Sequence, residues 1–132
     1  VEEIDQEISS LNYEIGGLGL FNGAKKKELK GKIGLLEKEK NNLLINFEIK
    51  KCESIIDEQK KLISNLESTM KIKVEDAKKN FDSTPFTAFG RRKELKQIYN
   101  NLLSRYNLLK KMAQDKINDY TRHIQLLRKR LY

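Results

Sequence analysis

The sequence contains no tryptophan, one proline, one cysteine and one histidine among its 132 residues. The single cysteine, Cys52, excludes a disulfide bond within the chain. The single histidine, His123, has no neighbouring side chains at the spacing of metal ligands or of a catalytic triad. The glycines do not follow a strand in the pattern of a phosphate-binding loop. We therefore expect no enzyme activity, no metal and no cofactor.

Long apolar runs are also missing, and none approaches the roughly 18 residues of a membrane-spanning helix. The first residues, Val1 to Asp5, are mostly acidic, whereas a secretion signal begins with basic residues. Together with the lone cysteine, this predicts a reduced, cytoplasmic setting, and we expect no membrane contact within this segment. The start at Val1 suggests a fragment of a larger protein.

Charged residues make up 35% of the chain and hydrophobic residues 38%, against about 25% and 45–50% in compact domains. Such a composition is typical of disordered chains or of elongated helical ones. The long aliphatic side chains recur at steps of three and four residues, which favours helices over disorder. This spacing predicts three helices, at about residues 2–18, 24–81 and 86–131.

Each predicted helix carries a row of apolar residues expected to face a neighbouring helix. The first row is Ile4, Ile8, Leu11, Ile15 and Leu18. The second helix has two overlapping rows, which are Leu29, Ile33, Leu36, Lys40, Leu43 and Phe47, and then Ile45, Ile49, Cys52, Ile56, Gln59, Ile63, Leu66, Met70, Val74, Ala77 and Phe81. The third row is Leu95, Tyr99, Leu102, Tyr106, Leu109, Ala113, Ile117, Tyr120, Ile124, Leu127 and Leu131.

Two short turns separate these helices, and short turns make consecutive helices antiparallel. The predicted fold is all-α, an elongated antiparallel coiled coil in which the first and third helices pack along the second. A bundle of three helices side by side is the alternative, and it fits less well because the first helix is short. We expect Ile4 to lie near Lys38, Pro85 to suit the first turn of the third helix, and phenylalanines to fill the open ends of the coil. The predicted turn residues are Phe21, Gly23, Pro85, Phe86 and Gly90.

The two turns have similar sequences. Residues 27–30 and 93–96 both read Lys-Glu-Leu-Lys, at an offset of 66 residues, and basic residues and a Phe precede each. We predict a single module over residues 1–132, within which the offset allows a tandem repeat of helical hairpins at 1–66 and 67–132. The pattern resembles helical-hairpin tips in coiled-coil segments of uncharacterised low-GC Gram-positive bacterial proteins. The second half also resembles the coil before the helix-hairpin-helix tail of bacterial kinase-like proteins. These resemblances imply a helical hairpin, and their motifs do not specify a function.

Charge is distributed unevenly along the chain. Residues 1–23 carry five acids and no base, whereas residues 90–132 carry twelve bases and three acids. We expect the acidic first helix to pair with the basic start of the second. The cations at the two turns and along the third helix are either solvated or in contact with an acidic partner or nucleic acid. The candidate contact residues are Lys25, Lys26, Lys27, Arg91, Arg92, Lys93, Lys96, Arg105, Lys110, Lys111, Arg122, Arg128 and Arg130.

These features predict a structural or protein-interaction module that acts as a spacer, docking or self-association element. The stretch from Leu35 to Phe47, which the short first helix leaves half-covered, is the expected docking surface for a partner or a second copy. Lys40 and Gln59 interrupt the apolar rows, where polar residues commonly fix register or oligomeric state. The alternative is a basic coiled coil that binds nucleic acid through a positive face of the third helix.

Overall fold

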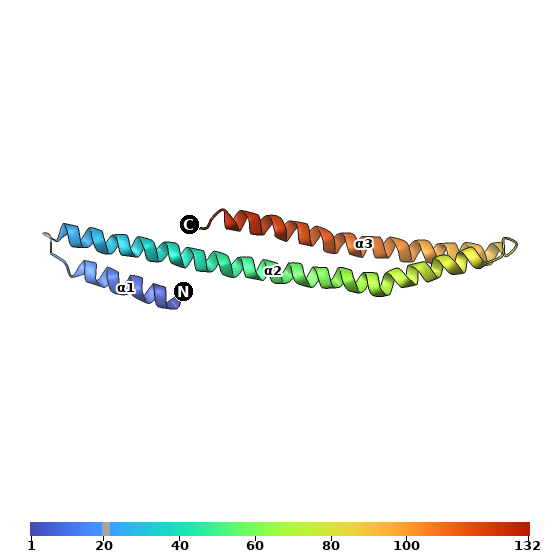
Figure 1. Ribbon diagram of the computed structural model, residues 1–132, viewed down its shortest axis with the longest axis horizontal. Coiled ribbons are helices and arrows are strands. Elements are labelled where there is room, and N and C mark those ends of the chain that lie inside the picture. The colour runs from blue at the N-terminus through green and yellow to red at the C-terminus, as the bar shows by residue number, and fades with distance from the viewer. Residues whose placement is uncertain (20–21) are drawn as a thin grey trace. The chain divides into compact units, whose positions relative to one another are not determined.

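The computed structural model describes residues 1–19 and 22–132 (Figure 1). Within these residues it contains three α-helices, α1 (Glu2–Gly16), α2 (Gly23–Ser83) and α3 (Phe89–Arg128), and no strand. The predicted all-α fold of three helices is thereby confirmed. The chain divides into two compact units, one formed by Val1–Lys51 with His123–Tyr132 and the other by Cys52–Arg122.

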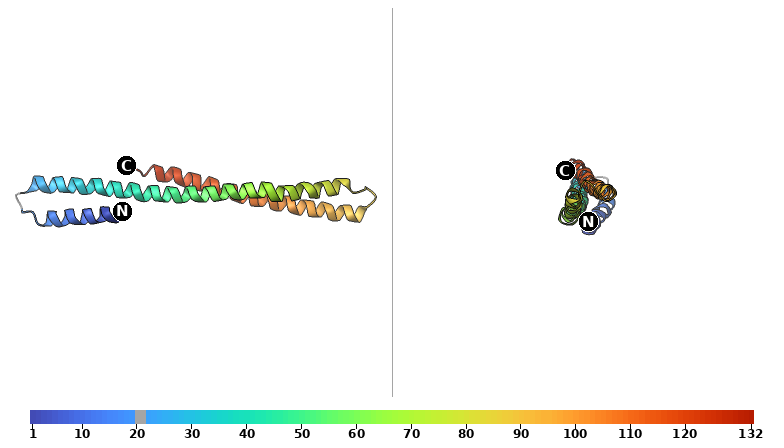
Figure 2. Two further views of the ribbon diagram at one scale, coloured as in Figure 1. Left: turned by 60° about the horizontal axis from the view of Figure 1, so that its bottom comes forward. Right: turned by 90° about the vertical axis from the view of Figure 1, so that its right-hand side faces the viewer.

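In the first unit, α1 lies antiparallel along the beginning of α2 (Figure 1 and Figure 2). Ile4 and Leu29 are buried, and the other residues of the first predicted row are half-buried. The Lys40 ammonium lies 2.5 Å from the Asp5 carboxylate, next to Ile4. This agrees with the expected register, in which Ile4 lies near Lys38. An acidic residue of α1 therefore pairs with a basic residue of α2, as the charge distribution predicts.

The last residues of the chain also belong to the first unit. Ile124 and Leu127 of α3 are buried, and beyond the helix the chain is held by two asparagines of α2. The Asn42 side chain accepts from the Tyr132 N–H at 2.8 Å and donates to the Tyr132 carbonyl at 3.2 Å. The Asn41 amide donates to the Arg130 carbonyl at 3.3 Å. These two side chains hold the chain end beyond α3, in addition to the backbone bonds from the N–H groups of Lys129, Arg130 and Leu131.

In the second unit, the later part of α2 runs antiparallel to the first part of α3 (Figure 1 and Figure 2). A salt bridge joins the two helices, with 3.1 Å between the Lys110 ammonium and the Glu67 carboxylate. All the buried apolar residues fall in the predicted rows, which confirms the expected periodicity. They are Cys52, Val74, Ala77, Leu95, Tyr106, Ala113 and Ile117.

The α2 helix changes direction in the green-to-yellow part of its ribbon, within the second unit (Figure 1). The Asn65 carbonyl there accepts hydrogen bonds from the Ser68 hydroxyl at 3.1 Å and from the Thr69 hydroxyl at 2.6 Å. Hydroxyls that bond to a carbonyl in the preceding turn compete with the helical N–H and often bend the helix. This pair of hydroxyls gives a local cause for the change in direction.

The ends of the helices differ from the expected ones by up to three residues. The α1 helix ends two residues early, where the N–H of Gly17 bonds to the Tyr13 and Glu14 carbonyls at 3.2 Å. The α3 helix begins at Phe89 instead of residue 86, and it ends at Arg128 instead of 131. Its start is set by Ala88, whose carbonyl accepts the Arg92 N–H at 2.9 Å and whose N–H bonds to Pro85 at 3.0 Å.

Pro85 is a turn residue as predicted, but its expected place in the first turn of the third helix is wrong, and so is the expected place of Gly90 in the turn. Pro85 lies in the turn, before the first turn of α3, because its carbonyl closes the turn with Ala88. Gly90 lies inside α3 and not in the turn. No glycine in the described ranges has a positive φ, so the predicted turn glycines, Gly23 and Gly90, do not adopt left-handed backbone.

Candidate interaction surfaces

Arg92 joins the end of α2 to the start of α3 in the second unit. Its guanidinium donates to the Thr84 carbonyl at 2.7 Å and, more weakly, to the Phe81 carbonyl at 3.5 Å. It also lies 4.4 Å from the centroid of the Phe81 ring and 5.4 Å from that of Phe86. Carbonyls at the end of a helix lack helical donors, and Arg92 supplies one to Thr84, whereas the Phe81 carbonyl also accepts the Thr84 N–H at 3.2 Å.

The sequence predicts that phenylalanines fill the open ends of the coil. This prediction is wrong for Phe86 and Phe89 of this turn. Phe86 is 77% exposed and Phe89 is 72% exposed. Their rings form an edge-to-face pair with centroids 6.2 Å apart and an interplanar angle of 73°. Arg92 and the half-buried Phe81 occupy the inner side of the turn, and this leaves Phe86 and Phe89 on its outer side.

The basic clusters after the two turns take corresponding positions. Lys25 pairs with Glu28 at 3.9 Å, and Arg91 pairs with Glu94 at 3.5 Å, both three residues apart. Two further equivalences follow the same offset of 66 residues. Lys26 and Arg92 are both half-buried, and Leu29 and Leu95 are both buried. Of the other predicted turn residues, Gly23 is the first residue of α2, and Phe21 lies outside the described residues.

The candidate cations of α3 do not gather on one face. Lys96 and Arg105, nine residues apart, point in nearly opposite directions, because a helix turns by about 100° per residue. Arg122 pairs with Asp119 in the same helix. Lys110 bonds to Glu67, and this hydrogen bond, with the nearby Tyr106, raises the pKa of Lys110 above that of an ordinary lysine. The other candidate contact residues are exposed. They are Lys27 of α2, Lys93, Lys111 and Arg128 of α3, and Arg130, which follows α3.

An apolar row on α2 lies beyond the reach of α1 in the first unit. We use this name for Leu43, Leu44 and Phe47, of which Phe47 is the most exposed at 58%. Leu43 and Phe47 continue the spacing of the residues that face α1, which ends at Lys40 with the Asp5 ion pair. Lys51 lies over the Phe47 ring, 4.7 Å from its centroid. The sequence predicted this exposure; the structure shows where the covering by α1 stops.

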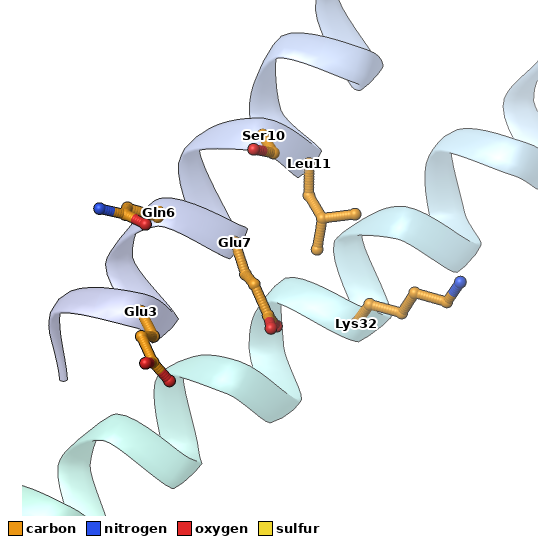
Figure 3. A pocket seen from close by; sticks show the side chains of 6 residues that line it. All are labelled: Glu3, Gln6, Glu7, Ser10, Leu11 and Lys32. Carbon is orange, nitrogen blue, oxygen red and sulfur yellow. The ribbon is translucent and has the colours of Figure 1, made fainter.

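A polar groove lies between α1 and α2 in the first unit, with a volume of about 630 Å³. Figure 3 shows its lining, in which Glu7 and Leu11 point from α1 toward α2 and the Lys32 side chain runs along α2. The other lining residues are Glu3, Gln6, Ser10 and Leu11. Across the described residues, no three His, Cys, Asp or Glu side chains are placed to hold a metal ion. The groove therefore offers scattered polar groups and no organised binding site.

A second groove, of about 430 Å³, lies between α2 and α3 in the second unit. Leu62, Leu109 and Met112 form its apolar part, and Asp115, Lys116 and Asp119 stand at its edge. Gln59, the polar residue of the predicted row, lines it too and is half-buried. The apolar area is small, and the charges at the edge have both signs, so the groove does not select a ligand.

The single cysteine and the single histidine differ in exposure. Cys52 is 4% exposed at its expected row position, whereas His123 is exposed on α3. None of the helices, over the part of the chain that the structure describes, is long and apolar enough to cross a membrane. Comparison of the chain with protein-family models, with curated proteins and with solved structures gives no match.

Two features of these surfaces had no counterpart in the sequence analysis. The Asn41–Asn42 pair was not singled out, because nothing in its neighbourhood distinguishes it from exposed asparagines. Arg92 was counted among the partner contacts, although it also holds the turn. A signal for that role exists in the sequence, since the first turn has lysines where the second has arginines, and a guanidinium can bond and stack at once.

Proposed function

We propose that this chain is a non-enzymatic interaction module that binds an α-helix, in the first instance one from a second copy, through the apolar row on α2. The observation that carries the proposal is that the apolar row continues the row of α2 residues that packs on α1. Leu43 and Phe47 extend the row that already packs on α1, at the same spacing, and both are exposed. A further helix placed end to end with α1 would meet the kind of surface that α1 itself covers.

The flanks of the row indicate what such a helix is like. Lys40, Lys50 and Lys51 lie at its two ends, and Lys40 pairs with an acidic residue of α1. An amphipathic helix with acidic flanks fits this surface best. Full burial of a Leu or Phe side chain contributes about 1.5–3 kcal/mol. Because the row residues are already partly covered and association itself has a cost, we expect self-association to be weak.

Light scattering over a concentration series tests this proposal. We expect the mean mass of the wild-type chain to rise with concentration, and Phe47→Ser to suppress the rise. Leu126→Ser is the matched control, because Leu126 is similarly exposed and belongs to the same unit, but lies on α3. If the chain is strictly monomeric at a concentration of about 1 mM, any dissociation constant of the dimer is weaker than that, and the proposed self-association is contradicted.

A second candidate function is the binding of nucleic acid by the cations of α3. Residues 90–132 carry twelve bases and three acids. Two of those acids, Glu94 and Asp119, pair with arginines of the same helix. Cations on several sides of a helix suit contact with phosphates better than reading of bases. A salt titration separates this candidate from the first, since phosphate binding weakens steeply as salt rises, and no binding at about 50 mM salt removes it.

We also propose a reducing, cytoplasmic setting for the module. The support is that Cys52 is the one cysteine of the sequence and is buried, so no disulfide within the chain calls for an oxidising setting. Slow labelling of the native chain by a thiol reagent, and fast labelling after unfolding in urea, is the result expected from this burial.

A further inference from the structure

We propose that the hairpin tip between α2 and α3 binds an anionic membrane surface. The hairpin tip is defined as residues 84–93, and its exposed aromatic pair, Phe86 and Phe89, is the part that would enter the interface. The proposal goes beyond helix docking by the apolar row, and it uses a different unit of the chain. It also departs from the expectation of no membrane contact, which rested on the lack of a long apolar run and did not consider the exposed phenylalanines of the tip.

The first argument is the apolar surface at the tip. A Phe side chain offers on the order of 150–250 Å² for burial, and about three quarters of Phe86 and of Phe89 is exposed. The two rings touch edge to face, so their exposed surfaces are continuous. Together the two rings expose on the order of 300 Å² of contiguous apolar surface, a patch of the size that is often functional in monomeric proteins.

The tip is held in one conformation by hydrogen bonds within the turn. The Ala88 N–H donates to the Pro85 carbonyl at 3.0 Å, and the Thr84 hydroxyl donates to the Asn80 carbonyl at 2.6 Å. Arg92 bonds to the Thr84 carbonyl from the inner side. A turn that is already ordered loses little conformational entropy on binding. Its satisfied carbonyls also reduce the number of bare polar groups carried toward a lipid phase.

The end of the hairpin around the tip carries a net positive charge. Residues 78–96 carry six bases and two acids, Asp82 and Glu94, so the end of this hairpin is strongly cationic. Arg91 and Lys93, which directly follow the aromatic pair, are exposed. Apolar rings next to cations match the two layers of an anionic bilayer surface, acyl chains beneath negative headgroups. A protein partner would need a concave apolar pocket with acidic walls to receive a convex tip.

The absence of tryptophan from the sequence makes a direct test available. Phe86→Trp places a single indole at the tip, and its emission is followed as the full chain is mixed with vesicles. We expect a blue shift with phosphatidylcholine vesicles that contain about a third phosphatidylserine, and a smaller one or none with phosphatidylcholine alone. Leu108→Trp is the control, because Leu108 is also exposed in the second unit, on α3 away from the tip, and its emission should stay unchanged.

Co-sedimentation with the same vesicles measures the affinity. We expect Phe86→Ser with Phe89→Ser to weaken binding at least about tenfold, and Arg91→Gln with Lys93→Gln to weaken it severalfold, more at low salt than at high salt. Leu108→Ser should bind as the wild type does. The proposal is overturned by a wild-type chain that does not sediment with anionic vesicles, or by a double Ser variant that binds equally well. If that variant does not fold, unchanged emission of Phe86→Trp still overturns it. None of these results depends on the apolar row.

Discussion

The Arg92 guanidinium makes two kinds of contact that a lysine in the same place would not combine. It donates to a carbonyl at the end of α2 and lies against the faces of Phe81 and Phe86. Hydrogen bonds from a charged group each contribute about 1.5–3 kcal/mol, and a partly buried cation over an aromatic ring contributes about 0.5–2 kcal/mol. Arg91, its neighbour, has only an exposed ion pair with Glu94.

We predict that Arg92→Ala lowers the free energy of unfolding of the second unit by about 1–3 kcal/mol, since it removes a charged hydrogen bond and a stacked cation. Arg91→Ala, the matched control, should lower it by at most about 0.5 kcal/mol, because exposed ion pairs stabilise little. Urea denaturation followed by circular dichroism measures both values. Equal effects of the two substitutions would show that Arg92 does not hold the turn.

At the scale of the elements, α2 is continuous through residues with poor helix propensity. Gly31 and Gly34 lie inside it, and glycine in a helix interior is less stable than alanine by about 0.5–1 kcal/mol. A Cβ atom added at either position would meet nothing within 4 Å. The structure gives no packing reason for either glycine. The start of α2 also carries cations and no acid in its first turn, against the helix dipole.

We predict that Gly31→Ala and Gly34→Ala each stabilise the chain by about 0.5–1 kcal/mol, because alanine restricts the unfolded backbone and fits the folded one. Thermal unfolding followed by circular dichroism should show the increase. Gly17→Ala tests the same mechanism outside a helix, because φ at Gly17 is −83°, which alanine also adopts, and this substitution should stabilise the chain as well. A loss of stability at Gly31 or Gly34 would point to a contact of the glycine that a Cβ disturbs.

At the scale of the whole molecule, the helices could be predicted well from the sequence and the turns could not. Each apolar row repeats along one dimension, so Ile4, Ile49 or Ile117 could be placed inward from spacing alone, and each is buried. The turn at residues 84–88 depends on Arg92, which reaches back eight residues to Thr84. Such a bond leaves no periodic trace. The outward position of Phe86, whose ring Arg92 also contacts, belongs to the same turn and could not be predicted from spacing.

The candidate surfaces follow the same division. Exposure of Phe47 was predictable, because the length of the first helix and the spacing of the second row are both visible in the sequence. The arrangement of cations on α3 was predictable only as a composition. Lys110 and Arg122 find acidic partners through the packing of helices or through spacing on one helix, and the net charge does not reveal this.

The last prediction concerns the order in which the three helices open. The α1 helix has 15 residues and a single buried one, whereas α3 has 40 residues and six buried ones. Isolated helices shorter than about 12–15 residues are marginal in water, so α1 depends on its docking to α2. We expect its amides to exchange with solvent deuterium before those of α3.

Lys40→Gln, which removes the ion pair with Asp5 and leaves the dipole of α1 unchanged, should speed exchange in α1 about two- to fivefold. Lys30→Gln, an exposed lysine of the same part of α2, should not. Exchange in α1 that is as slow as in α3 would mean that α1 is held by contacts stronger than those its half-buried side chains and one ion pair can supply.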